Sequence, residues 1–354
     1  MLKQLTFLLL FTSFAATAQY HITGRVVDSA TLKPVADASV FLSNASAGAK
    51  TNNDGTFTIT DVRGGQYEMV ISIIGYATYK QTVMANKDLN LPDILISQQV
   101  IRLQEVLISG PDKHWAEHYA KFKRDFIGTT DNAGKCEILN PHELRFNNNQ
   151  GDFTAVADGF LIVENKALGY RIKYMLTDFS DNSKTGIVYF AGRAFFEAMK
   201  GSRHKQKQWI KNRLATYQGS DMHFLRSIIA NKVKEEGFLV RRLIRKPNPT
   251  YKGGLDNKYL QTLVTTPLQT GEYAGLTDQK GEYILAFKDC LAVSYNNNPL
   301  SGSVLTISAP YLYFDNNGIV LNPKDATFEG NWSESRIAGM LPVDYEPSQE
   351  ITIR

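Results

Sequence analysis

The sequence predicts an all-β N-terminal domain, a sandwich of about seven antiparallel strands, followed by an α+β domain. Three observations lead to this fold class. From Tyr20 to Ile108, short runs of alternating apolar and polar residues are interrupted by Gly, Pro, Asn or Asp at spacings of about ten residues. Beyond Pro111, apolar residues at helical spacing mix with further strand-like runs. The chain has 354 residues, more than one hydrophobic core usually organises, so two domains are expected.

Residues 1–18 have the features of a secretory signal peptide. Lys3 supplies a basic start, Leu5 to Phe14 form a short apolar core, and Ala16-Thr17-Ala18 is a small-residue cleavage site. The apolar core is shorter than the ~20 residues that a membrane-spanning helix needs. We therefore expect the mature chain to begin at Gln19, with no transmembrane segment; a retained membrane anchor is the alternative.

The strands of the first domain follow one another between short turns. They are predicted at residues 22–28, 38–42, 56–60, 67–73, 77–84, 89–95 and 100–108. In the first strand, Ile22, Gly24 and Val26 share one face, as a half-buried strand requires. Asn52-Asn53-Asp54-Gly55 predicts a tight hairpin turn, because its last positions tolerate a positive φ.

Residues at these turns and strands carry a family resemblance. The motifs are Gly24-x-Val26-x-Asp28, Pro34-Val35-x-x-Ala38-x-Val40, Thr51-x-Asn53-Asp54-Gly55-x-Phe57-x-Ile59, Gly65-x-Tyr67 and Ile74-Gly75-Tyr76. This pattern resembles the carboxypeptidase regulatory-like domain, which implies a prealbumin-like, seven-stranded β-sandwich at residues 19–109. In zinc carboxypeptidases that domain is an accessory to the catalytic one and carries no zinc ligands. The resemblance therefore does not imply a protease.

A second resemblance concerns location. Leu103-Gln104-Glu105-Val106 is similar to the segment at which this module leads into the plug of TonB-dependent receptors in Bacteroidetes-type bacteria. The residues that follow are too few for a receptor barrel. The resemblance implies an exported protein in the periplasm or outer cell envelope of a diderm bacterium. A periplasmic component associated with a TonB-dependent outer-membrane receptor is one alternative function.

Residues 110–354 predict the α+β domain. Asp112 is expected to cap a helix over 113–126, and two more helices are expected at 205–217 and 220–236, the last ending at Gly237. Strands are expected at 136–139, 153–157, 160–163, 170–179, 185–191, 283–287, 304–307, 311–314 and 319–321, in one sheet system with a helical insertion. Turns are expected at 147–151 and 180–182.

Parts of the second domain are similar to a region of no assigned activity in Bacteroidetes envelope proteins. The similarity lies in Phe126 to Thr130, Cys136-x-Ile138-Leu139-Asn140-Pro141, Glu164-Asn165-x-x-Leu168-Gly169-Tyr170 and Tyr217-x-Gly219-Ser220-x-x-His223-Phe224-Leu225-Arg226. It supports the two-domain organisation and implies no mechanism.

Cys136 and Cys290 are the only cysteines. One bridge would not hold a chain of this length together, so two independently buried thiols are the favoured interpretation and a disulfide between them stays open.

The sharpest chemical candidate is His114-Trp115-Ala116-Glu117-His118, which matches the H-x-x-E-H motif. Histidines four apart on a helix share a face and could hold zinc while the glutamate activates water. The motif is short and a catalytic site needs a third ligand, so a solvated helix is favoured over a zinc-dependent hydrolase.

His223 is a second candidate, as an acid or base beside Asp221 and Arg226, although capping or packing is the more common role of such a residue. The sequence contains no nucleophile elbow, phosphate loop, dinucleotide fingerprint or calcium loop.

Basic residues concentrate in one region, although the whole chain carries a net charge of only +4, too mild to indicate a nucleic-acid partner. They are Lys200, Arg203, Lys205, Lys207, Lys211, Arg213, Arg241, Arg242, Arg245 and Lys246. Such residues could face anionic glycans or lipid head groups, or form a solvated helix face.

These observations favour a non-catalytic, secreted cell-envelope protein. Its sandwich would be an interaction or spacer module, and its second domain would bind an envelope protein or a glycan. We assign no catalytic, metal-binding or cofactor-binding residue. The binding residues and the oligomeric state remain open from sequence.

Overall fold

A computed structural model describes residues 19–99, 113–149, 151–253 and 258–347. The predicted signal peptide, the predicted last strand at 100–108, the receptor-like segment at 103–106 and the proposed cap Asp112 lie outside these residues. Among the residues described, no helix is long and apolar enough to cross a membrane.

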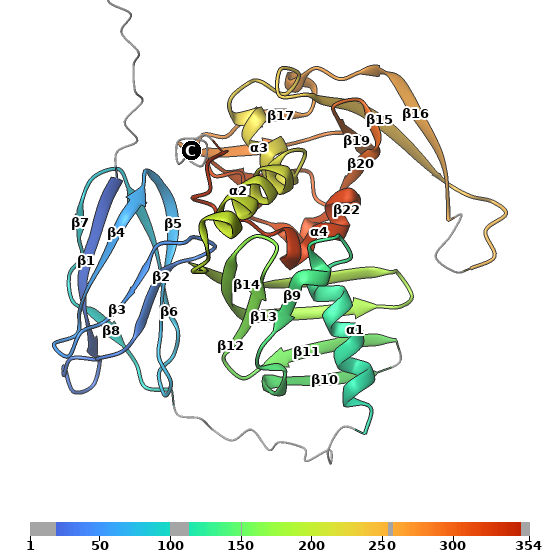
Figure 1. Cartoon of the computed structure of the whole chain (residues 1–354). Coiled ribbons are helices and arrows are strands. Elements are labelled where there is room, and N and C mark those ends of the chain that lie inside the picture. Colours follow the sequence, from blue (N-terminus) through green and yellow to red (C-terminus); the bar gives the residue numbers. More distant parts are fainter. Residues whose placement is uncertain (1–18, 100–112, 150, 254–257, 348–354) are drawn as a thin grey trace, which may run out of the picture.

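The N-terminal part is a β-sandwich, seen at the left of Figure 1. One sheet has the order β4 (Thr56–Arg63), β1 (Gln19–Asp28) and β7 (Leu89–Asn90), and β8 (Ile94–Ile96) also pairs with β1. The other sheet has the order β3 (Gly48–Lys50), β2 (Ser39–Leu42), β5 (Gly65–Ser72) and β6 (Tyr79–Ala85). The alternating apolar residues of both sheets, such as Ile22, Ile59 and Met69, fill the space between them. The predicted fold class is confirmed.

The turn at Asn52–Gly55 is present, but the hairpin predicted there is wrong. Gly55 has a φ of +78°, and a Cβ at this position would lie 2.4 Å from the carbonyl oxygen of Val26. The strands on either side join different sheets, because β3 pairs with β2 and β4 pairs with β1. The turn therefore carries the chain from one layer of the sandwich to the other.

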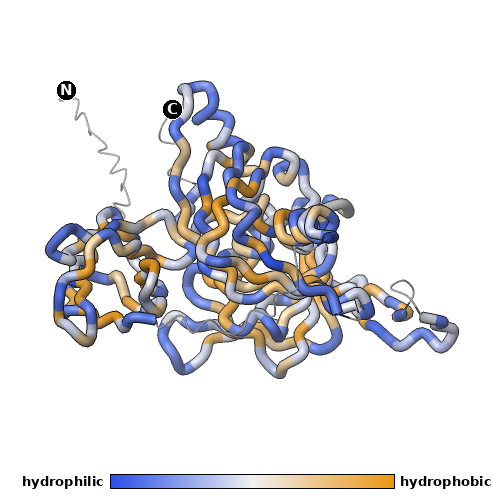
Figure 2. Tube along the Cα trace, turned by 90° about the horizontal axis from the view of Figure 1, so that it is seen from below, coloured by the Kyte–Doolittle hydropathy of each residue, from blue (hydrophilic) through white to orange (hydrophobic). Residues whose placement is uncertain are grey.

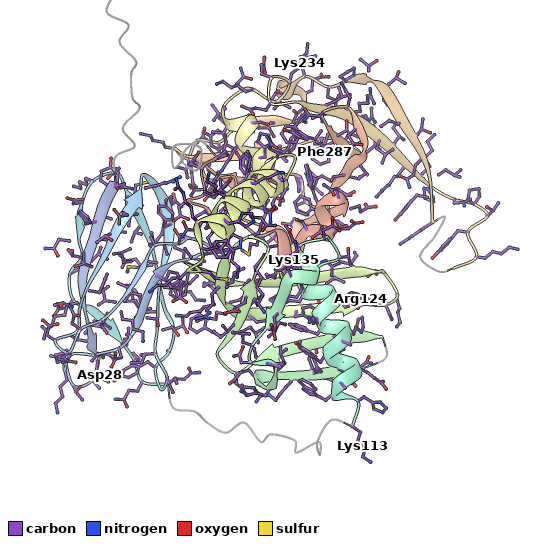
Figure 3. All side chains as sticks on the ribbon, in the orientation of Figure 1. Asp28, Lys113, Arg124, Lys135, Lys234 and Phe287 are labelled. Atoms are coloured by element: carbon purple, nitrogen blue, oxygen red, sulfur yellow. The ribbon has the colours of Figure 1, made fainter. Side chains whose placement is uncertain are left out.

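Asp28 explains why several motif residues occur together. This buried carboxylate accepts hydrogen bonds from the backbone N–H groups of Ala30 and Thr31, the hydroxyls of Thr31 and Tyr76, and the side-chain amide of Gln98, at 2.8–3.0 Å. These bonds hold its pKa well below the usual range, the backbone bond from Thr31 contributing most. The carboxylate thus joins the end of β1 to the turns around Tyr76 and Gln98, at the lower end of the sandwich in Figure 3.

The second part contains three sheets rather than the single sheet system predicted. The largest has the order β10 (Leu144–Asn149), β11 (Asp152–Ala157), β13 (Tyr170–Asn182), β12 (Phe160–Asn165) and β9 (Cys136–Ile138), with β14 (Ile187–Ala198) also on β13. A five-stranded sheet has the order β16 (Tyr259–Pro267), β15 (Phe238–Pro247), β19 (Cys290–Tyr295), β20 (Asn298–Ile307) and β22 (Ala326–Gly330). The smallest joins β17 (Ala274–Leu276), β18 (Glu282–Leu285) and β21 (Leu312–Asp315).

The helices are α1 (Trp115–Ile127), α2 (Arg203–Tyr217), α3 (Asp221–Ile229) and α4 (Asn331–Gly339) within the described ranges. Short 3₁₀ turns lie at 133–135, 141–143, 270–272 and 323–325. Helix α1 covers the largest sheet, and its Phe122 and Phe126 stack there in a core separate from that of the sandwich.

Several predicted boundaries are wrong. Helix α1 begins at Trp115, and α3 ends at Ile229 rather than Glu236, because Asn231 has a φ of +53° that no helix continues through. Val233, within the segment predicted as helix at 220–236, is still buried in the core beside α3. Strands β10 and β13 extend into the turns predicted at 147–151 and 180–182, and β15 and β16 were not predicted at all.

Asp28→Asn is expected to lower the stability of the protein at neutral pH and to flatten its acid dependence. The pKa of Asp28 is lowered in the folded state from 3.8, so its contribution is complete above about pH 4 and is lost as the pH falls further toward the folded pKa. Urea unfolding at a series of pH values measures both effects. Asp37→Asn, at an exposed position whose φ of +58° asparagine tolerates, is the matched control. If the free energy of unfolding of the Asp28 variant falls at acidic pH as steeply as that of the unmodified protein, this account is contradicted.

Candidate functional site

The sandwich is fixed to the second part through the turn between β2 and β3. The backbone N–H of Asn44 donates to the carbonyl of Ala194 at 2.7 Å, and its side-chain oxygen accepts from the N–H of Ala194 at 3.1 Å. Next to it, the N–H of Phe196 donates to Ala45, and Ala45 forms a parallel bridge with Phe195. The turn therefore pairs with β14 through one short parallel bridge.

Side chains reinforce this contact. Arg193 on β14 forms a two-pronged ion pair with Glu68 on β5. Phe41 packs against Phe160 and Phe195, with ring centroids 5.9 and 5.6 Å apart. Gly48 lies directly under the ring of Phe195, where a Cβ would approach to 2.7 Å. The contact is thus part apolar, part ionic and part backbone pairing.

We call the contact between the sandwich and the second part the joint. The segment from Val343 to Glu346, the closing segment, completes this contact from the other side. The N–H of Val343 donates to the carbonyl of Asn44 at 2.7 Å, and the side chain of Val343 belongs to the core of the sandwich. The carboxylate of Asp344 accepts from the backbone N–H and the hydroxyl of Ser46, the latter at 2.6 Å. Residues almost three hundred positions apart in sequence therefore share one hydrogen-bonded turn.

Arg226 on α3 holds that closing segment. Its guanidinium donates to three backbone carbonyls, those of Asn317 at 2.9 Å, Tyr345 at 2.8 Å and Val343 at 2.7 Å. The side-chain amide of Asn317 in turn donates to the carbonyl of Gln66 in the sandwich. Arg226 thus holds backbone of the second part, and Asn317 links that backbone to the sandwich.

A pocket of about 530 Å³ lies at this joint, lined by residues of both parts. Its lining includes Arg63, Tyr67, Tyr217, His223, Ser227, Arg226, Glu236, Asn317, Asp344 and Glu346. Arg63 approaches Glu346 at 3.8 Å. Burial, with the nearby charge of Asp344, raises the pKa of Tyr67 to about 12, so its phenol is protonated at neutral pH.

The proposed acid–base role of His223 does not match its surroundings. Its Nδ1 accepts the backbone N–H of Gly219 at 3.1 Å, so the ring proton lies on Nε2, which donates to Glu236 at 3.2 Å. Burial lowers the pKa of this imidazole, although Glu236 opposes the shift. Both nitrogens are engaged, and the ring packs against Tyr217 and Phe238. The geometry indicates a structural histidine.

Asp221 and Arg226 do not form the constellation expected around His223. Asp221 accepts from the N–H of Met222 at the start of α3, and Arg226 turns toward the carbonyls described above. The acidic partner is instead Glu236, from the turn after α3. The sequence motif Tyr217 to Arg226 marks a folding element that joins α2, α3 and the closing segment.

One face of α2 binds the turn between β12 and β13. The indole N–H of Trp209 donates to Lys166, the amide of Asn212 to Ala167, and Nε of Arg213 to Leu168, at 2.7–3.1 Å. In the same turn, the buried side chain of Asn165 accepts the N–H groups of Ala167 and Leu168 and donates to Ala338 on α4. Arg213, which the sequence placed in the basic cluster, is therefore a structural residue.

The opposite face of α2 presents unneutralised positive charge. Arg203, Lys207 and Lys211 follow one another at four-residue spacing and are exposed. Lys200, which precedes the helix, and Lys205, which is four residues before Trp209 and shares its side, are also exposed. No ion pair with an acidic side chain is found for any of these five within the described ranges, and α2 contains no acidic residue. We call Arg203, Lys207 and Lys211 the α2 basic face.

Most of the other predicted basic residues are not part of that surface. Arg242 pairs with Asp289, and Arg245 pairs with Glu329 through both terminal nitrogens. Both lie on β15, a strand that was not predicted. The predicted basic region therefore contains structural ion pairs on β15, one exposed helix face and Lys246, which is exposed on β15.

The H-x-x-E-H residues lie at the start of α1. His114 Nδ1 is 3.3 Å from Glu117 Oε2, and the rings of His114 and His118 are 6.2 Å apart. The ring of His118 also packs against Phe146 and Phe153. In the part of the chain that the structure describes, no three His, Cys, Asp or Glu side chains come together in a group that could hold a metal ion.

Both cysteines are buried and free. The thiol of Cys136 donates to Asn132, and burial raises its pKa to about 12. Cys290 accepts from the hydroxyl of Thr306. The favoured interpretation of two independently buried thiols is confirmed.

Comparison with known proteins identifies the sandwich. Residues 22–108 match the family model of the CarboxypepD_reg-like domain, so the N-terminal sandwich is such a domain, as its motifs predicted. The match does not extend into the second part. No curated protein matches the chain.

Three solved structures resemble it in part. They are a type II cohesin–X-dockerin complex from Acetivibrio cellulolyticus (26% identity, 22% of this chain, 58% of that chain, TM-score 0.20), the pilus 2b backbone protein of group B streptococcus (20%, 23%, 42%, 0.20) and a DUF3823 family protein from Parabacteroides merdae (11%, 54%, 86%, 0.19). The chain thus spans about half the length of the first two. At these TM-scores the resemblances carry no functional conclusion.

Arg226→Lys is expected to lower the free energy of unfolding by about 2–4 kcal/mol, because a lysine cannot reach three carbonyls at once and leaves buried acceptors unsatisfied. Hydrogen exchange should accelerate at the amides of Val343 and Tyr345. Arg203→Lys, on the exposed face of α2, is the control and should change neither quantity. If hydrogen exchange at these two amides is as slow in the Arg226 variant as in the unmodified protein, Arg226 does not hold the closing segment.

His223 should make stability fall as the solution becomes acidic. Because its folded pKa lies below the unfolded value of 6.5, the unfolded chain binds the proton first, and stability decreases as the pH drops through about 6.5. His223→Gln should reduce this slope in urea unfolding measured between pH 5 and 8. His142→Gln, at an imidazole whose side chain is 76% exposed, is the control. If the free energy of unfolding of His223→Gln changes with pH as steeply as that of the unmodified protein, His223 is not the group responsible for the pH dependence.

Proposed function

We propose that this chain is an exported, non-catalytic binding protein of the cell envelope of a diderm bacterium, and that its partner is an anionic glycan bound by the α2 basic face. The single observation that carries the proposal is that face: three exposed cationic side chains with no ion pair to an acidic side chain in the described structure, on a helix whose other side is fixed to the protein. Its charge is therefore available to a partner.

The geometry of the helix favours a linear polyanion. Residues four apart on an α-helix are separated by about 6 Å along the axis, so Arg203, Lys207 and Lys211 form a slanted row that extends about 12 Å along the axis. A chain of uronic acid or phosphorylated sugars repeats its charges at a comparable distance. Gln208, exposed on the same helix, can hydrogen-bond to sugar hydroxyls.

A lipid surface fits this face less well. Peripheral helices that bind membranes pair their cations with an apolar face that enters the lipid. In α2 the apolar Trp209 is buried against the turn at residues 166–169, and none of the exposed large hydrophobic residues described lies on α2. The charge of α2 is thus presented without an apolar anchor.

The role proposed for the sandwich is to brace the second domain. Its turn at Asn44 pairs with β14 and with Val343, so the sandwich would support the second domain in a fixed position and would not act as a flexible spacer. Export is supported by the signal-peptide features of residues 1–18, and the envelope location by the resemblance around Glu105-Val106.

The test is binding of oligogalacturonate, a linear polyuronate, by titration calorimetry at low and at physiological salt. Replacing Arg203, Lys207 and Lys211 together by Gln should weaken binding about tenfold or more, since each exposed charge contributes up to about 1 kcal/mol. Affinity in the unmodified protein should fall with salt. Lys33, Lys50 and Lys80, exposed on the sandwich, replaced together by Gln form the control. Equal binding of a neutral oligosaccharide, or equal loss in both triple variants, would overturn the proposal.

A further inference from the structure

The β15–β16 hairpin extends away from the body of the protein (Figures 1 and 2). Pairing between β15 and β19 covers Phe238 to Leu243, whereas pairing between β15 and β16 continues to Pro247 opposite Tyr259. The distal half of the hairpin is therefore a two-stranded ribbon. Such a ribbon is marginally stable when it stands alone in water.

Strand β16 is the edge of the five-stranded sheet and pairs only with β15 in the described structure. Eight of its nine residues are exposed, Val264 being the exception. On the side away from β15, alternate residues of the strand present backbone N–H and C=O groups to solvent. The strand is longer than an average strand, so this row of groups is long.

The composition of β16 lacks the usual protection of an edge. Its sequence, Tyr-Leu-Gln-Thr-Leu-Val-Thr-Thr-Pro, contains no charged residue, and its proline stands at the last position. Soluble proteins usually shield edge strands with lysine, internal proline or very short length. Here Tyr259, Leu260 and Leu263 are 40%, 54% and 45% exposed. Apolar side chains thus occur on both faces of the ribbon, as expected for a strand that is covered by another strand.

We propose that β16 pairs antiparallel with β16 of a second copy of this chain, joining two five-stranded sheets into one continuous sheet across a twofold axis. Because the strand is uncharged, self-pairing places no like charges opposite each other. A foreign strand selected by charge would find no charged residue on β16 to recognise. A twofold pairing also closes on itself and leaves neither copy with an open β16 edge.

The charges around the hairpin are compatible with this arrangement. In an antiparallel pair centred near Leu263, the two Lys258 residues lie at opposite ends of the ribbon, roughly 30 Å apart. Of the four cations on the neighbouring strand β15, Arg242 is paired with Asp289 and Arg245 with Glu329. Lys246 lies opposite Leu260, away from the centre of the pair. The contact is narrow, smaller than the ~800 Å² per partner of a standard interface, so we expect a dimer that dissociates on dilution.

The experiment is light scattering coupled to gel filtration on the full mature chain over a wide concentration range. The unmodified protein should shift from monomer to dimer as its concentration rises. Leu263→Lys and Leu260→Lys, each at an exposed position that tolerates lysine in the monomer, should each raise the dissociation constant at least tenfold. Leu276→Lys, at a 76% exposed leucine on the edge strand β17, is the matched control and should dimerise normally.

A distance measurement fixes which strands meet. A nitroxide attached at Gln261→Cys, with Cys136 and Cys290 buried and unlabelled, should report a short distance between copies in the dimer. A protein that stays monomeric at every concentration, a dimer insensitive to both lysine variants, or a long distance between the labels would each overturn the proposal. Circular dichroism of the variants confirms that they remain folded, so loss of the dimer cannot reflect loss of the fold.

Discussion

The arrangement of the whole molecule depends on the five-residue turn around Asn44. This asparagine, in a left-handed conformation with a φ of +59°, bonds to β14 through its N–H and side chain and to Val343 through its carbonyl. Asparagine adopts that conformation more readily than other residues with a Cβ. One turn therefore connects the sandwich, the largest sheet and the closing segment. Hydrogen bonds from Arg226 to Val343 and Tyr345 hold the closing segment in place. The two parts behave as one body because they share backbone hydrogen bonds and not only side-chain contacts.

This constraint also explains the chemistry of the joint. Polar groups that are buried between two domains must be hydrogen-bonded within the protein or to a ligand. Around the pocket, the guanidinium of Arg226, both nitrogens of His223 and the carboxylate of Asp344 already have protein partners. Side chains that would suggest acid–base catalysis in another setting are therefore engaged in holding the joint. The groups available to a partner lie on the outer surface instead, above all on the α2 basic face.

The sandwich could be predicted from sequence because its determinants are local. Alternation places Ile22, Ile59 and Met69 in the core, and the requirement for a positive φ selects Gly55. The pairing of the strands next to Gly55 could not be predicted, since the same turn can join neighbours in one sheet or cross between two. Arg245 shows the other limit. Its role as an ion-pair partner of Glu329 depends on a contact across 84 positions, and nothing in the run of basic residues distinguishes it from the exposed Lys207. For His223, the cap by Ser220 is a local contact, but Glu236 was assigned to a helix that in fact ends earlier.

The two surfaces proposed for binding lie on one rigid body and do not overlap, and this has a consequence for affinity. The α2 basic face and the edge of β16 belong to different elements, so a dimer joined through β16 would carry two copies of the basic face. A long polyanion that binds one face then meets the second at a high effective concentration, and avidity can exceed the affinity of either face by orders of magnitude. Because α2 and β16 both belong to the second part, that effective concentration is set by its fold and not by a flexible linker. Glycan length is therefore the variable on which binding by the dimer should depend, while binding by a single face depends only on the local density of charge.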